Sequence, residues 1–101
     1  MFVIEIFLPL TDNAGVPFPE DYFEAERNTL TAEFGGLTIY ARAPANGIWA
    51  RNAAVVSDEI VIFEVMTSEP DVAWWQAYRR AVEAKFRQEK IVIRSSAISL
   101  L

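Results

Sequence analysis

Strand-like and helical stretches follow one another along this chain in an order that few folds accommodate. Four stretches rich in β-branched and aromatic residues predict strands at 2–8, 37–42, 59–66 and 91–100. One helix is expected from about Pro19 to Phe34, and a second is expected to begin with the segment Ser68–Asp71, before the last strand. The order strand–helix–strand–strand–helix–strand is that of the split βαβ arrangement.

This order predicts an α+β fold of the ferredoxin-like βαββαβ type. Right-handed crossovers place the strands of an antiparallel sheet in the spatial order 4-1-3-2, with both helices on one face. The chain has 101 residues, the length of one domain, and about two-thirds of its surface should be buried on folding. We therefore expect a single ferredoxin-like domain over residues 1–101.

Local signals mark the ends of both helices. Glu20 and Asp21 suit the first turn of the first helix, and Gly35-Gly36 supplies its stop signal. The segment Ser68–Asp71 fits a capping box for the second helix. Its core-facing stripe, at helical spacing, is expected to be Trp75, Tyr78, Val82 and Phe86.

Between the helices, the strand-like sequence is interrupted twice. Pro44 cannot donate a hydrogen bond in a central ladder, and Asn46-Gly47 is a turn pair. We expect the chain to turn there, Ile48–Arg51 to rejoin the sheet, and 52–57 to form a loop.

Alternation within the strands separates an apolar face from a mixed one. The apolar set, which the helices should cover, is Phe2, Ile4, Ile6, Leu8, Val61, Phe63 and Val65. The opposite set, here called the open face, is Val3, Glu5, Phe7, Thr38, Tyr40, Arg42, Ile60, Ile62, Glu64, Val92 and Arg94. Because exposed apolar patches of this kind usually mark interfaces, we expect a homodimer that packs two open faces together.

The residue types that the chain lacks exclude several kinds of catalytic and metal site. The chain has no cysteine and no histidine, which excludes thiol catalysis, histidine-based triads and zinc sites of the usual kind. We expect no cofactor and no metal. The net charge of −5 argues against nucleic acid and an anionic membrane surface as partners. The apolar segment 1–10 lacks the basic start and cleavage site of a signal peptide, so we expect a cytoplasmic location.

The open face carries the first candidate site. Glu5 and Glu64 lie on neighbouring strands, where an antiparallel register brings them close and could make one of them a general acid or base. The favoured alternative is ordinary cross-strand pairing, of Glu5 with Arg94 and of Glu64 with Arg42.

Aromatic and basic residues give two further candidates. One is a ligand-binding cluster for an anion, made of a phenol, an aromatic platform and two cations: Tyr40, Trp49, Arg42 and Arg51. The alternative interpretation is that Trp49 packs at the sheet edge and the arginines are solvated. Trp74 lies about 80° from the centre of its helix's apolar stripe, where it covers the edge of the core or reaches a partner.

Several motifs together resemble a family of small uncharacterised bacterial proteins, similar to a secreted domain family of unknown function. They are LTDNAGVPFP, EFGGLT, GIW, VIFEVM, WWQAYR and FRQEKIVIRSS. The resemblance implies a compact ferredoxin-like domain and transfers no catalytic residue. It draws attention to Asp12, Asn13, Trp49, Glu64, Trp74 and Gln88-Glu89.

Two classes of function remain open. The first is a non-catalytic homodimeric module that binds a small ligand or a protein, for which the open face suffices. The alternative is a cofactor-independent enzyme of the dimeric α/β-barrel type, such as a small monooxygenase or isomerase. Many such enzymes use histidine, which this chain lacks, and no catalytic residue is assigned.

Overall fold

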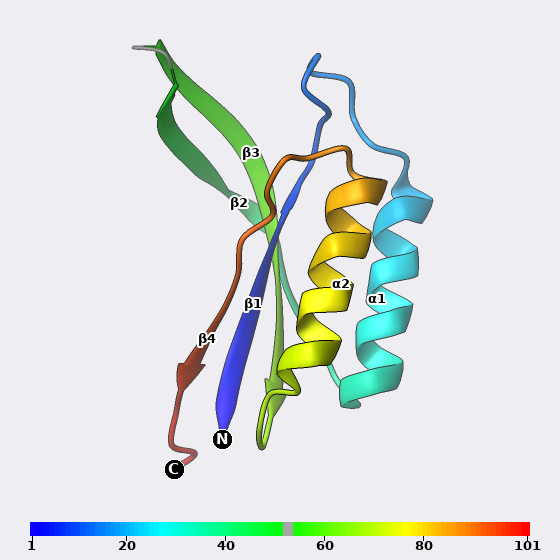
Figure 1. Cartoon of the computed structure of the whole chain (residues 1–101), viewed down its shortest axis with the longest axis vertical. Coiled ribbons are helices and arrows are strands. Elements are labelled where there is room, and N and C mark those ends of the chain that lie inside the picture. Colours follow the sequence, from blue (N-terminus) through cyan, green and yellow to red (C-terminus); the bar gives the residue numbers. More distant parts are fainter. Residues whose placement is uncertain (52–53) are drawn as a thin grey trace.

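The computed structural model describes the backbone of residues 1–51 and 54–101 and the side chains outside 41–58. The elements in chain order are β1 (Phe2–Pro9), α1 (Glu20–Phe34), β2 (Thr38–Arg51), β3 (Ala54–Thr67), α2 (Val72–Lys85) and β4 (Ile93–Ala97). The strands form one antiparallel sheet in the order β2-β3-β1-β4, and both helices cover the same face (Figure 1). The predicted ferredoxin-like α+β fold and its strand order are therefore confirmed.

The core lies between the helices and the apolar face of the sheet. Ile6 and Leu8 of β1 and Phe86 after α2 are fully buried, and Phe63 of β3 nearly so. Each such side chain stabilises the fold by roughly 1.5–3 kcal/mol on burial. The predicted alternation is right for both central strands, although Phe2, at the first position of β1, is only half-buried.

The ends of the helices follow from local chemistry. α1 ends at Gly35, whose φ of 76° is the left-handed conformation that glycine adopts readily, and its N–H donates to the Thr31 carbonyl at 2.8 Å. α2 begins later than the predicted capping box requires. Its N-cap is Asp71, whose Oδ1 accepts from the Trp74 N–H at 3.1 Å. Ser68 lies three residues before that cap, so its predicted capping role is wrong.

The β2–β3 hairpin is longer than the sequence predicts. Asn46 pairs with Glu59 and Gly47 with Asp58, so the turn predicted at Asn46-Gly47 is wrong. The register shifts between Tyr40 and Ala45, the interval that contains Pro44. β2 is an edge strand, where a proline can be accommodated at an irregularity of the ladder.

The rest of the hairpin follows the prediction in part. Ile48–Arg51 rejoins the sheet as expected, whereas 54–57 belongs to β3 and is not a loop. Residues 52–53 lie outside the described part of the chain. The hairpin projects beyond the helix layer (Figure 1).

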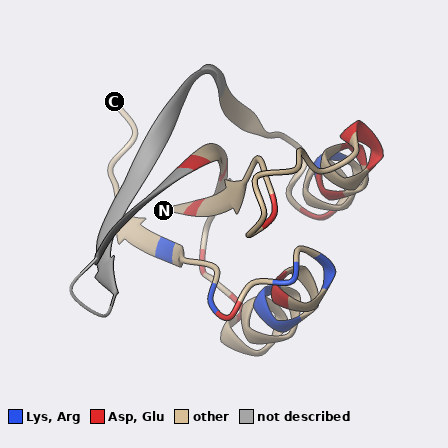
Figure 2. Ribbon diagram, turned by 90° about the horizontal axis from the view of Figure 1, so that it is seen from above, with Lys and Arg blue, Asp and Glu red and all other residues tan. Residues whose placement is uncertain are grey.

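The two helices carry different charges. Figure 2 shows acidic residues gathered on one helix, α1, and basic residues on the other, α2. One basic side chain of α2, that of Lys85, crosses to the acidic helix and binds Glu26 there. No helix within the described residues is long and apolar enough to cross a membrane.

Candidate interaction surface on the open sheet face

Four polar side chains form a row across the open face, one from each strand. Arg94 of β4 is the register partner of Glu5 on β1, and Glu5 is the register partner of Glu64 on β3. Tyr40 of β2 completes the row, because its hydroxyl reaches back to Glu64. We call these four residues the polar row.

Glu5 and Arg94 form an ion pair at one end of this row. The Nε of Arg94 donates to Oε1 of Glu5 at 2.9 Å, and the guanidinium stacks over the ring of Phe7 at 4.8 Å. The predicted cross-strand pairing of Glu5 with Arg94 is thus present in the structure. An exposed pair of this kind contributes little to stability, but it fixes where the positive group sits.

Tyr40 and Glu64 form a second pair at the other end. The phenol donates to Oε2 of Glu64 at 3.1 Å. This hydrogen bond and the carboxylate's charge raise the pKa of Tyr40, because both favour the neutral phenol. The alternative pairing of Glu64 with Arg42 falls on a side chain outside the described residues.

The centre of the polar row holds two adjacent carboxylates. Like charges directly opposite each other on neighbouring strands destabilise a sheet. Each carboxylate is stabilised by a donor from the strand outside it, Arg94 for Glu5 and Tyr40 for Glu64. With one arginine against two glutamates, the polar row keeps one negative charge, which suits a cationic group on a partner or ligand.

Apolar side chains flank the polar row on the same face. Val3 and Phe7 of β1 and Ile60 and Ile62 of β3 are only partly buried. Met66, the register partner of Val3, is exposed to 52%. The open face therefore combines apolar area with a charged centre, the composition that the sequence predicts.

The structure does not bring all of the candidate site residues together. Trp74 lies on the helix side, where it packs against Phe34 at 5.3 Å and stacks on Tyr78 at 5.2 Å. It covers the edge of the core and is remote from the polar row. The side chains of Arg42, Trp49 and Arg51 lie outside the described residues, so Tyr40 is the one member of that predicted ligand-binding cluster whose side chain the structure describes.

A buried polar network between the helices is not evident from local sequence. Glu26 of α1 is buried, accepts from the Tyr78 hydroxyl at 2.9 Å and pairs with Lys85. Burial and the charge of Glu26 strongly raise the pKa of Tyr78. The one available signal is spacing, because Phe23, Glu26 and Leu30 share one stripe of α1.

Neighbouring side chains already engage both carboxylates of the polar row. Among the described residues, no group of three or more acidic side chains is placed to hold a metal ion. The carboxylates of the polar row are positioned instead for hydrogen bonds and ion pairs.

Comparison with known proteins supports the fold alone. No family model matches the chain, and no curated protein matches its sequence. Solved structures do match. A phage SAM lyase in complex with S-methyl-5'-thioadenosine is similar at 14% identity and a TM-score of 0.65, over 94% of this chain and 79% of that one.

Two proteins named CutA are also similar in structure. A point mutant of CutA1 from Pyrococcus horikoshii OT3 gives 13% identity and a TM-score of 0.62, over 100% of this chain and 86% of that one. The PII-like protein CutA from Nostoc sp. PCC 7120 gives 16% identity and a TM-score of 0.61, over 97% and 81%. These neighbours share the ferredoxin-like architecture with the chain.

Proposed function

We propose that this protein is a non-catalytic homodimeric binding module whose two copies associate through their open faces. The observation that carries the proposal is the polar row, set among incompletely buried apolar side chains on a face that no described element covers. Apolar flanks supply the driving force for association, and a charged centre fixes the orientation of the partner.

The apolar flanks favour a second copy as the occupant of the open face. A two-fold axis parallel to the strands reverses the strand order of the facing sheet, so β4 of each copy lies over β2 of the other and β1 lies over β3. Arg94 of each copy then faces Tyr40 of the other, while Glu5 faces Glu64, so the apolar area supplies the attraction. The Arg94–Tyr40 contact occurs twice across such an interface, as in every isologous dimer.

Light scattering coupled to size exclusion tests this assembly. We expect the wild type to show about twice the chain mass of 11.4 kDa. Met66→Lys, which places a charge on the open face, should shift the protein to the monomer. The matched control is Val16→Lys in the β1–α1 loop, because Val16 has a similar exposure of 57%. A wild-type monomer at tens of micromolar, or equal effects of both variants, would contradict the proposal.

A second candidate function is a cofactor-independent enzyme, favoured by the Tyr40–Glu64 hydrogen bond. A phenol held by a carboxylate, with Glu5 alongside, is a group that can donate or accept a proton. Because one structural neighbour is a SAM lyase, the purified protein can be incubated with SAM and assayed chromatographically for S-methyl-5'-thioadenosine. Product from the wild type but not from Tyr40→Phe would favour the enzyme; no product from either would favour the binding module.

A further inference from the structure

The outer edge of β4 carries backbone groups that no described strand uses. β4 is the last strand of the sheet, and its described partner is β1. Val92 and Ile98, which flank β4, both hydrogen-bond to the backbone of the β1 segment. Because alternate residues of an antiparallel ladder direct their backbone groups to opposite edges, Ile93, Ser95 and Ala97 point theirs away from the sheet. Such a row of unpaired N–H and C=O groups is a template for a further strand.

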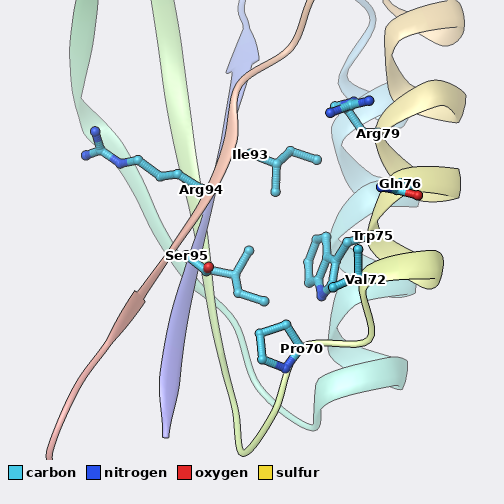
Figure 3. Close-up of a pocket in the computed structure, with 9 residues that line it drawn as sticks. Pro70, Val72, Trp75, Gln76, Arg79, Ile93, Arg94 and Ser95 are labelled. Carbon is cyan, nitrogen blue, oxygen red and sulfur yellow. The ribbon is translucent and has the colours of Figure 1, made fainter.

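A pocket lies beside this edge, between β4 and α2 on the helix side of the sheet. Its volume is about 150 Å³. Ile93 and Ser95 of β4 form one wall, and Trp75, Gln76 and Arg79 of α2 form the other. Figure 3 shows Arg79 at the end nearer Ile93, whereas Ser95 lies beside the start of α2. Since a cavity of about this volume elsewhere holds benzene, the pocket has room for one branched apolar side chain.

The charges around the pocket favour an acidic group at one end. Among the described residues that line it, two are arginines and none is acidic. Arg94 is turned away and binds Glu5 on the open face, which leaves Arg79 as the cation beside the pocket (Figure 3). The Nε of Arg79 lies a long 4.0 Å from Glu83, whose other carboxylate oxygen accepts from the Ile91 N–H at 2.9 Å. The guanidinium therefore keeps donors for another acceptor.

We propose that β4 accepts an extended segment of a partner protein as a fifth strand, running antiparallel to β4. Opposite Ser95, the segment presents an apolar side chain to the pocket. Two residues later, opposite Ile93, it presents an aspartate or glutamate to Arg79. In this register each outward-pointing residue of β4 exchanges two backbone hydrogen bonds with the segment. Main-chain bonds of this kind supply affinity, and the pocket for alternate side chains supplies specificity.

A second copy of this chain fits the edge of β4 less well than such a segment. In an antiparallel pair of β4 strands centred on Ser95, this serine would face its own equivalent, which is too small and polar to fill the pocket. Ile93 would face Ala97, which leaves Arg79 without an acidic partner. The side chains that complement the pocket therefore belong to a different chain.

The first experiment titrates the ¹⁵N-labelled protein with the peptide acetyl-Thr-Thr-Leu-Thr-Glu-Thr-amide, whose leucine and glutamate have the required spacing. We expect the amide protons of Ser95 and Ala97 to move downfield and to exchange more slowly with water, because they gain acceptors. Those of Arg94 and Ser96 should move less, because they already bond to β1. Serine in place of the leucine should weaken binding about tenfold. Shifts without this alternation, or no saturation by about 5 mM peptide, would overturn the proposal.

Two pairs of variants test the edge and the cation separately. Ser95→Pro removes an outward N–H without removing a bond to β1, and it should weaken peptide binding at least about tenfold. Ser95→Ala keeps that donor and should leave the affinity unchanged. Arg79→Ala should weaken binding about threefold, whereas Arg80→Ala, with the same charge change one position away, should not. Equal effects within either pair would contradict the proposed contacts.

Two further outcomes separate this site from associations between copies of the chain. Slow exchange of the Ser95 amide in the free protein, with a dimer that Ser95→Pro converts to a monomer, would assign the edge to a second copy and overturn the proposal. Because Met66→Lys acts on the open face, loss of the dimer with peptide binding intact would support this site independently of the proposed assembly.

Discussion

The Tyr78–Glu26 and Tyr40–Glu64 hydrogen bonds place one chemical pair in two environments. Between the helices, the phenol donates at 2.9 Å to a carboxylate that is 7% exposed and also pairs with Lys85. On the open face, the phenol donates at 3.1 Å and is itself 47% exposed. Burial is the largest cause of the raised pKa of Tyr78, whereas the hydrogen bond to Glu64 is the largest for Tyr40.

This difference means that the Tyr78–Glu26 pair stabilises the fold, whereas the Tyr40–Glu64 pair is available to bind a partner. A buried carboxylate is strongly coupled to its neighbours, because the protein interior screens charge poorly and offers no substitute partner. Water competes for the exposed pair, so that pair adds little to folding but stays free to exchange its partner.

The strongest test removes each carboxylate in turn. Glu26→Ala leaves the Tyr78 hydroxyl without its acceptor and Lys85 with the Tyr22 carbonyl but without its carboxylate. We expect it to lower the free energy of unfolding by about 2–4 kcal/mol, since Lys85 is partly exposed. Glu64→Ala should cause a much smaller change. Urea unfolding followed by tryptophan fluorescence measures both. Comparable losses would mean that the exposed pair is also part of the core.

A second test uses alkaline pH. The unfolded chain loses the Tyr78 proton near pH 10, whereas the folded protein retains it because its pKa is raised. The folded state then binds more protons, so the free energy of unfolding falls as pH rises above 10, by about 1.4 kcal/mol per pH unit for this group. Tyr78→Phe should remove that slope, and Tyr22→Phe should not. An unchanged slope in Tyr78→Phe would assign it to other groups.

The smallest expected effect concerns the exposed phenol. Glu64→Gln removes the charge that raises the pKa of Tyr40, so Tyr40 should titrate at a lower pH than in the wild type. Glu5→Gln should shift it less, because Glu5 is the weakest of the named causes. Absorbance at 295 nm, with the Tyr40→Phe titration subtracted, follows this phenol alone. A larger shift in Glu5→Gln would reverse the assignment.

Much of the fold could be predicted because its determinants are local. The alternation of Ile4, Ile6 and Leu8 sets the buried face of β1, and the stripe containing Val82 and Phe86 sets that of α2. The element order then leaves one strand order compatible with right-handed crossovers. That order makes β3 and β4 the neighbours of β1, and the observed register places Glu5 beside both Glu64 and Arg94.

The features that sequence reasoning misses depend on contacts that a local pattern does not contain. Asn46-Gly47 is a strong turn signal, yet its ladder partners Glu59 and Asp58 lie across the hairpin and keep it extended. Glu26 is an ordinary exposed helix residue by composition, and only Tyr78 and Lys85, far along the chain, make its burial possible.

Trp74 shows the same limit of sequence reasoning, because the sequence makes it a candidate site residue and the structure places it at the edge of the core. Tryptophan is common in interfaces, which makes Trp74 a candidate site residue on composition alone. Its ring contacts with Phe34 and Tyr78 hold it instead at the edge of the core. Those contacts join two helices that are distant in the chain, so no pattern within α2 could reveal them.

The hydrogen bond between Tyr78 and Glu26 also bears on the order of folding. It joins residues 52 positions apart, and the whole β2–β3 hairpin lies between them in the chain. The helices can meet at this hydrogen bond only after the chain between Glu26 and Tyr78 has closed into a loop. Loop closure costs entropy before the contacts that it allows have formed. We expect the bond to form after the rate-limiting step, so that its loss accelerates unfolding more than it slows folding. The helix pair would then determine how long each molecule stays folded.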